Sequence, residues 1–370
     1  MSEDCTPWPQ VALGDFCEFK YGKSLPEAMR SGGAVPVYGS NGVVGSHDIA
    51  ITMGPTIVVG RKGSYGEVNF SPVACWPIDT TYYIDKTATD VDLAWLRHTL
   101  VGLGLNTMNK AAAVPGLNRD DAYRARLVRP PLLEQRRIAA ILDQAETLRA
   151  QRRAAIAQLD SLGRAIFLEM FGDVVGNPKT FPKMPLASFS TISTGSTPGR
   201  ENGAYFGGTI PWVKTTEVCG EEIAFTEEML TQEGLKAIRG KLHPVGSIAV
   251  AMYGQGQTRG RCGLLSISAA TNQACGVIYP SESHEPTFLF AQLKLSYERL
   301  RALGRGGNQE NLNLQLLGGF EVLLPSLQMQ REFLLRSSSL DFLKASHRAA
   351  LTKLDELFAS LQHRAFRGEL

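Results

Sequence analysis

The 370-residue sequence lacks the features that mark several classes of protein. No run of about 18 or more apolar residues is present, so no transmembrane helix is expected. The first residues lack the basic and apolar stretches of a signal peptide. Six cysteines are scattered without a Cys-x-x-Cys pair, which argues against a structural zinc site or a disulfide framework. These absences predict a protein of the reducing cytoplasm with no membrane partner.

An excess of charge of one sign is also missing. The net charge is +2, with 20% charged and 44% hydrophobic residues, which is typical of a soluble globular protein. The total charge therefore does not indicate nucleic-acid binding, and the distribution of the charges matters more. A chain of this length predicts about two to four domains.

Catalytic and cofactor motifs are absent as well. No Gly-x-x-x-x-Gly-Lys-Ser/Thr phosphate loop occurs, and no helix-opening pattern follows the glycine-rich run 254–263. Residues 177–181 (Asn-Pro-Lys-Thr-Phe) match the Asn-Pro-Pro-Phe/Tyr signature of amino-group DNA methyltransferases only loosely. The six histidines show no metal-ligand spacing, and no paired acid cluster indicates a nuclease. The chain is therefore predicted not to be an enzyme, and to hold neither a metal nor a cofactor.

What the sequence does contain is an internal repeat. Several residues of the first half recur 195 residues later, and the fronts of the two halves match at an offset of 173 residues. The pairs at the longer offset are Leu117-Asn118 and Leu312-Asn313, Pro130 and Pro325, Gln135-Arg136 and Gln330-Arg331, and Leu159-Asp160-x-Leu162 and Leu354-Asp355-x-Leu357. A duplicated module that folds as one body tends toward pseudo-twofold symmetry, which B-DNA also has.

Each half combines a globular part with a long helix. Short apolar runs such as 57–59 alternate with glycines and predict mixed α/β structure over 1–131 and 173–325, the latter with a linker. Apolar residues at three- and four-residue steps predict helices over 132–172, roughly 58 Å long, and 326–370, with a kink or break at 336–339. The predicted fold class is α+β, with the helices paired as an antiparallel coiled coil. The alternative is that each helix packs only onto its own domain.

Polar loops flanked by glycine are the candidate ligand contacts. Arg, Lys, Asn and Gln can bond to base edges, while Ser, Thr, Tyr and backbone N–H groups serve phosphates. Ordinary solvated hairpins are the alternative, but both halves place such a loop after an apolar strand, at 57–59 and 248–250. Arginines from 119 to 137 add charge that is more simply a solvated face. The candidates for DNA binding are Ser40, Asn41, Arg61, Lys62, Ser64, Tyr65, Thr80, Thr81, Lys214, Thr215, Tyr253, Gln255, Gln257, Thr258, Arg259, Arg261, Asn272, Gln273 and Asn308.

Specific motifs support a family resemblance. Residues 130–136 and 325–331 look like the Pro-Pro-Leu-x-Glu-Gln-Arg motif that begins a spacer helix, and 362–370 resembles the ending Ala-Phe-x-Gly-Glu-Leu. Val59–Gly63 and Met252–Gly256 are similar to two common loop types of recognition domains. Over its whole length the chain resembles the specificity subunit of Type I restriction–modification enzymes. Phe171-Gly172-Asp173 departs from the family ending, as expected where the chain continues.

The resemblance implies a non-catalytic DNA reader. Two target-recognition domains would each bind one half of a split double-stranded site, with the helices as a spacer. Two methyltransferase subunits would dock on the helices, and restriction and translocation subunits would join them. S-adenosylmethionine, ATP and Mg²⁺ would belong to those partners. The alternatives are a Type IIB-like specificity subunit, a self-sufficient adenine methyltransferase or nuclease, and a coiled-coil scaffold that does not bind DNA.

Overall fold

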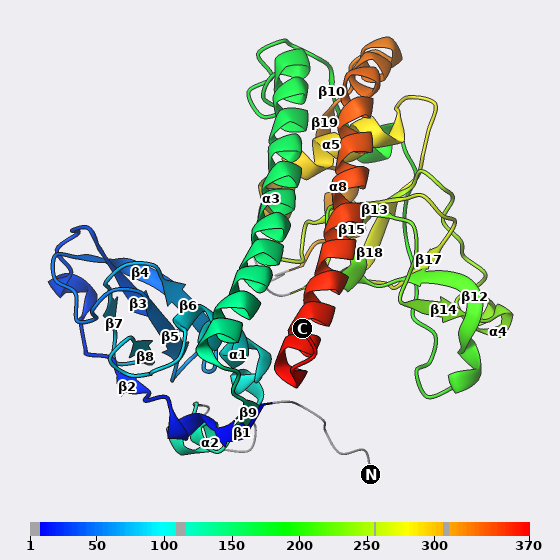
Figure 1. The fold of residues 1–370 in the computed structure, drawn as a ribbon. Helices are drawn as coiled ribbons and strands as arrows, with labels where there is room; N and C mark the ends of the chain where they lie inside the picture. Colours follow the sequence, from blue (N-terminus) through cyan, green and yellow to red (C-terminus); the bar gives the residue numbers. More distant parts are fainter. Residues whose placement is uncertain (1–7, 109–115, 255–256, 306–310) are drawn as a thin grey trace. The chain divides into compact units, whose positions relative to one another are not determined.

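A computed structural model describes residues 8–108, 116–254, 257–305 and 311–370 (Figure 1). The chain divides into two compact units, of which the first comprises residues 1–155 and 347–370 and the second residues 156–346. Each unit therefore holds one globular domain and a segment of each long helix, α3 (Leu132–Phe171) and α8 (Leu327–Arg367). Within the described part of the chain, no helix is long and apolar enough to cross a lipid bilayer.

The first globular domain is built on a small antiparallel sheet. Strand β5 is buried along its whole length, because Ile57 and Val59 face helix α1 while Val58 packs on Tyr38. Its strands, in the order β2-β8-β5-β6, are Lys20–Tyr21, Thr81–Asp85, Thr56–Gly60 and Val68–Ser71. A second sheet has the order β4-β3-β7, with Gly42–His47, Val35–Gly39 and Trp76–Pro77. The remaining elements are β1 (Gln10–Ala12), β9 (Arg126–Val128), α1 (Leu93–Gly102) and α2 (Arg119–Tyr123).

Helix α1 begins with an N-terminal cap formed by Asp92. The Asp92 carboxylate accepts hydrogen bonds from the backbone N–H groups of Ala94 and Trp95, both at 3.0 Å. This satisfies donors that the first turn of a helix cannot pair internally. Leu96 and Leu100 are fully buried on the face that covers β5.

The second globular domain repeats this plan with a larger sheet. Strand β15 (Ile248–Ala251) is again buried throughout and forms the centre. The sheet order is β11-β18-β15-β16-β13, with Ile192–Thr194, Cys275–Ile278, Cys262–Leu265 and Glu222–Ile223 around β15. A second sheet has the order β14-β12-β17, with Glu228–Leu230, Phe206–Val213 and Ala270–Thr271. The remaining elements are β10 (Lys183–Pro185), β19 (Glu321–Leu323), α4 (Gln232–Ala237), α5 (Pro286–Leu295), α6 (Tyr297–Ala302) and α7 (Leu314–Gly318).

The two long helices run antiparallel where they touch in each unit. In the first unit, Arg149 of α3 lies 2.6 Å from Asp355 of α8, and the Arg137 guanidinium donates to the Leu370 carbonyl at 2.6 Å. In the second unit, Lys344 lies 3.0 Å from Asp160. The alternative in which each helix packs only onto its own domain is therefore wrong.

The repeat is visible in these contacts. Arg149–Asp355 and Lys344–Asp160 join positions that are equivalent at the 195-residue offset. Arg152 contacts His347 at 3.1 Å, and these two residues are themselves repeat equivalents. The contacts between the helices therefore repeat at the same 195-residue offset as the sequence.

The predicted break at 336–339 is wrong, because α8 continues through it. The Ser337 and Ser338 hydroxyls donate to the carbonyls of Leu334 and Leu335, at 3.3 and 2.9 Å. Serine weakens a helix because its side chain can bond to nearby backbone groups in non-helical conformations, in competition with the helix hydrogen bonds. Here the hydroxyls bond within the helix, and Ser337 is buried, so tertiary packing overrides the low intrinsic propensity.

Candidate nucleic-acid interface

In the first unit, the chain brings four of the predicted residues together beyond the end of β5. The Ser40 hydroxyl donates to the carbonyls of Lys62 and Thr80, at 2.6 and 2.8 Å. The backbone N–H groups of Arg61 and Lys62 both donate to the Thr80 carbonyl, at 2.9 and 3.1 Å. Gly63 and Gly66 have φ values of +74° and +77°, which glycine adopts without strain. The loop is thus fixed by its backbone, and the Arg61 and Lys62 side chains are not used to build it.

Two neighbouring candidates have structural roles instead. Thr81 is fully buried and its hydroxyl donates to the Ile78 carbonyl at 2.7 Å, so the prediction that it contacts DNA is wrong. Tyr65 is half-buried and packs against the domain core. Asn41 and Ser64 are exposed, as a contact residue must be.

A cluster that is not apparent from the sequence surrounds Arg61. Its guanidinium lies 5.2 Å from the ring centroid of Tyr21, and the Arg119 guanidinium lies 5.3 Å from the same ring. Tyr21 is 50% exposed, and Arg119 Nε is buried without a hydrogen-bond partner. Within the described residues, no ion pair joins either arginine to a carboxylate. Two uncompensated cations beside an exposed ring can bind phosphates and stack on bases.

Tyr82 connects this cluster to the repeated Leu117-Asn118 motif. Its hydroxyl donates to the Leu117 carbonyl at 3.2 Å. Burial raises the pKa of Tyr82 to about 12, against a smaller opposing effect of Arg61 and Arg119. The phenol therefore remains a neutral donor at physiological pH. The local sequence does not show that Arg119 lies beside Tyr21, because the two residues are about a hundred positions apart in the chain.

In the second unit, the charge of Lys214 is already compensated. Its ammonium lies 2.8 Å from Glu227 and 3.0 Å from Glu228. Hydrogen bonds that the Lys214 ammonium donates to these two carboxylates raise the pKa of Lys214. Its backbone N–H donates to Glu217 at 2.7 Å, and Thr215 begins the 3₁₀ helix Thr215–Glu217. These contacts give Lys214 a structural role, and the expectation that it binds DNA stays a prediction.

The loop after β15 carries most of the remaining candidates. Gln257 accepts from the Arg261 guanidinium at 3.0 Å through its side chain, and from the Tyr297 hydroxyl at 2.8 Å through its backbone. Arg259 Nε is buried without a hydrogen-bond partner. Tyr253 is exposed and Thr258 is half-buried. The predicted residues Gln255 and Asn308 lie outside the described part of the chain.

Asn272 and Gln273 form the turn between β17 and β18. The Asn272 carboxamide oxygen accepts from the Ala274 N–H at 3.2 Å, as in an Asx turn. Gln273 is exposed, and its side-chain oxygen accepts from the Thr197 hydroxyl. Asn272 thus has a structural use, whereas Gln273 remains accessible.

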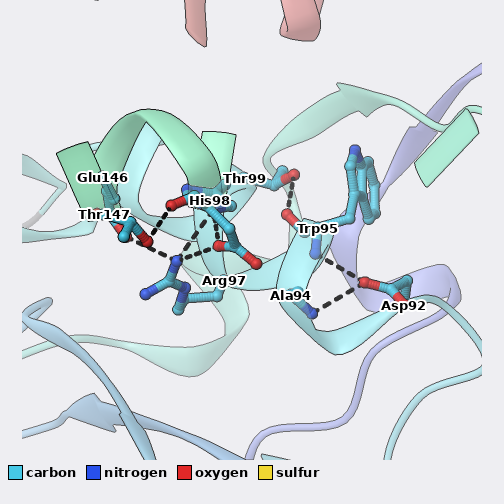
Figure 2. A network of polar contacts seen from close by, with 9 residues as sticks. Asp92, Ala94, Trp95, Arg97, His98, Thr99, Glu146 and Thr147 are labelled. Carbon is cyan, nitrogen blue, oxygen red and sulfur yellow. Dashed lines mark hydrogen bonds and ion pairs between the residues drawn. The ribbon is translucent and has the colours of Figure 1, made fainter. Parts of the chain in front are cut away.

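A polar network joins α1 to α3 in the first unit (Figure 2). The Arg97 guanidinium lies 2.7 Å from Asp143 and 2.8 Å from Glu146, and His98 Nε2 lies 2.8 Å from Asp143. Burial lowers the pKa of His98, which favours a neutral ring that donates to Asp143. His98, Asp143 and Glu146 are close enough to hold a metal ion, but the Arg97 cation already contacts both carboxylates. The arrangement fits a structural joint.

Comparison with known proteins decides the family. A family model for the Type I restriction modification DNA specificity domain matches residues 6–158 and 178–351, which is most of the chain. The chain belongs to this family. The two matched segments correspond to the two halves of the internal repeat, so each half is one specificity repeat.

A curated protein and a solved structure show this similarity. The Type I restriction enzyme HindI specificity subunit of Haemophilus influenzae is 26% identical over 197 residues, or 52% of this chain. The match covers 42% of that protein, less than half of its length. The crystal structure of the Type-I restriction-modification system S subunit from M. genitalium has a TM-score of 0.64 at 14% identity. It covers 99% of this chain and 98% of its own, and shows that the fold is shared.

The residues common to both specificity repeats form an identical joint in each unit. The Gln135 side chain accepts from the Asp92 N–H and donates to the Pro130 carbonyl, both at 2.8 Å. Gln330 accepts from the Glu285 N–H at 2.8 Å and donates to the Pro325 carbonyl at 2.9 Å. Both glutamines are buried.

Two further repeated residues support the same region. Arg136 and Arg331 lie 4.0 and 2.7 Å from the carboxylates of Asp92 and Glu285, which precede α1 and α5. The repeated Asn118 and Asn313 cap α2 and α7, accepting from backbone N–H groups at 2.9 and 2.8 Å. The specificity repeat therefore preserves the scaffold, and the candidate contacts lie in loops that differ between the halves.

Proposed function

We propose that this chain is the sequence-specific DNA-recognition subunit of a Type I restriction–modification complex. Each globular domain binds one half of a bipartite double-stranded site. One observation carries the proposal: in each family-matched half, the loop after the central buried strand carries arginines that form no ion pair with any carboxylate of the described residues. These are Arg61 after β5, and Arg259 and Arg261 after β15. Guanidinium groups pair with guanine in the major groove and with phosphates.

The long helices act as an antiparallel coiled-coil spacer and as the docking surface for two methyltransferase subunits. Leu148 and Leu343 are repeat equivalents and are 41% and 43% exposed. Leu162 and Leu357 are likewise equivalent, at 48% and 49%. Each helix thus presents the same pair of leucines outward, as two copies of one partner require.

The chemistry belongs to the partners in this proposal. The chain acts in the cytoplasm without catalysing a step, while methyltransferase subunits bind S-adenosylmethionine and restriction subunits use ATP and Mg²⁺. The specificity chain selects the site at which they act. Type I and Type IIB-like assemblies share this role, and the subunits that purify with the chain distinguish them.

The test compares one arginine from each domain. Arg61→Ala and Arg259→Ala chains are assembled with the methyltransferase partner and selected against random duplexes. Each variant should lose about 1–3 kcal/mol of binding free energy, because a paired contact to a base edge discriminates between bases by that amount. The two variants should relax specificity in different half-sites. Arg124→Ala is the matched control, since this exposed residue is already paired with Asp121.

The outcomes separate the possible roles. Equal weakening on all sequences would show that the arginines contact phosphates rather than bases. An unchanged half-site preference at unchanged affinity in both variants would contradict the proposed interface. Failure of the wild-type assembly to select any duplex would contradict the function itself.

A further inference from the structure

A cavity of about 290 Å³ lies in the second unit, at the base of the loop after β15. Its walls come from three places: Cys219 and Gly220, the loop residues 260–262, and Lys294 and Tyr297 at the adjoining ends of α5 and α6. We call it the loop–helix pocket. Two cationic residues line it. Arg261 is one of the residues predicted to contact DNA, and Lys294 belongs to helix α5.

Two cations line this pocket, Arg261 and Lys294. Among the described residues, neither forms an ion pair with a carboxylate. Arg259, Arg299 and Arg301 belong to the adjoining loop and to α6, and within the same described residues they form no ion pair either. An anion bound between Arg261 and Lys294 would therefore be stabilised by two positive charges that no carboxylate compensates.

Aromatic rings and hydrogen bonds hold the cations in place. The Lys294 ammonium lies 5.4 Å from the Phe290 ring centroid. The Tyr297 hydroxyl accepts from Arg301 at 3.2 Å while it donates to the loop at Gln257. A ligand that enters therefore meets groups that are already positioned, which lowers the entropic cost of binding.

Gly260 fixes the loop against α6. Its φ is +86°, and a Cβ there would lie 2.9 Å from the Arg301 backbone nitrogen. The close approach therefore requires glycine. Elsewhere in the same domain, Arg200 and Lys214 both pair with Glu228. Some cations of this domain therefore have carboxylate partners, whereas Arg261 and Lys294 at the pocket have none among the described residues.

We propose that the loop–helix pocket binds a phosphate group of the DNA backbone beside the half-site that the second domain reads. The inference rests on the proposed function. The Arg261 guanidinium and the Lys294 ammonium offer N–H donors and positive charge, which suit a phosphodiester. A mononucleotide or free phosphate carries the same chemistry, so both enter the test as separate arms.

Cys219 supplies a reporter at the pocket. It is exposed, whereas the other cysteines in the described residues are buried. In a Cys5→Ser chain assembled with the methyltransferase partner, maleimide labelling of the Cys219 peptide is followed by mass spectrometry. Saturating cognate DNA should slow labelling at least about tenfold, because a backbone seated in the pocket covers the thiol. Inorganic phosphate or AMP at millimolar concentration should slow it far less.

Charge removal gives the second readout. Lys294→Gln should weaken binding to cognate and unrelated duplexes by the same factor. It should also lower the slope of log affinity against log salt by about 1, the signature of one lost phosphate contact. Lys236→Gln is the matched control, since Lys236 is an exposed lysine of α4 in the same domain. It should change neither quantity, and thermal unfolding should verify that both variants fold.

The results distinguish the two proposals. If the assembly binds DNA selectively but Cys219 stays reactive, or if Lys294→Gln keeps the wild-type salt slope, the pocket assignment is overturned and the proposed function stands. Equal protection by inorganic phosphate or AMP would make the pocket a small-anion site and overturn the backbone assignment. If the wild-type assembly binds no duplex at any salt concentration, both proposals fail.

Discussion

Replacing Gln135 by leucine tests whether the repeated glutamine is the joint between a globular domain and its helix. The substitution keeps a similar volume but removes the bonds to the Asp92 N–H and the Pro130 carbonyl. Leaving a buried polar group unpaired costs about 1–3 kcal/mol. With two groups left unpaired, and a partial offset from the added apolar surface, the free energy of unfolding of the first unit should fall by roughly 2–4 kcal/mol.

Hydrogen exchange locates this loss. The Asp92 amide should exchange faster in Gln135→Leu, while the Glu285 amide should keep its protection. Gln330→Leu should show the reverse pattern, because Gln330 holds the Glu285 N–H. Peptide-level exchange is preferable to one unfolding curve, since a chain of two units need not unfold in a single step.

Gln144→Leu is the matched control, because Gln144 is an exposed glutamine of the same helix. Exposed substitutions usually change stability by less than about 0.5 kcal/mol. If Gln135→Leu behaved like Gln144→Leu and the Asp92 amide stayed protected, the glutamine would not be the joint, and the repeated motif would need another explanation.

Three further outcomes follow from the structure. Burial lowers the pKa of His243 from 6.5 to about 4, so unfolding takes up a proton between these values. The neutral buried ring contributes about 3 kcal/mol to the free energy of unfolding above pH 6.5, and this contribution is lost as the pH falls toward 4. The check is to compare the pH dependence of urea unfolding of the unchanged chain with that of His243→Gln. Asp160→Ala and Asp355→Ala should each cost at most about 1 kcal/mol, less at high salt, in the same assay; a salt-independent loss would point to packing. A fragment of residues 1–173 should dimerise through its exposed helix face, and Arg152→His should strengthen the dimer, because Arg152 would face its own copy; light scattering that found only monomers at tens of micromolar would contradict the twofold picture.

The repeated elements are the part of the molecule that sequence alone could predict. The strand at 57–59 stands out because both of its faces are covered, which leaves an unbroken apolar run. The Asp92 cap follows from a local rule about helix starts. The long helices are likewise encoded by short-range periodicity, which the sequence displays directly.

The interface could be predicted only as a set of loops. Thr81 and Arg61 both lie in polar stretches of the sequence, yet Thr81 is buried and Arg61 lies at the surface beside Tyr21. The charge of Lys214 is compensated by ion pairs with Glu227 and Glu228, which lie more than ten residues further along the chain. Such differences arise from contacts between distant segments, and a local pattern cannot contain them.

The glutamine joint has a consequence for how such a chain can vary. Within the described residues, the Gln135 and Gln330 side chains bond to backbone N–H and carbonyl groups, and an acidic residue before α1 or α5 adds an ion pair. Because these bonds use backbone groups of the domain, they constrain few of its side chains. Substitutions in the recognition loops therefore leave the glutamine bonds intact.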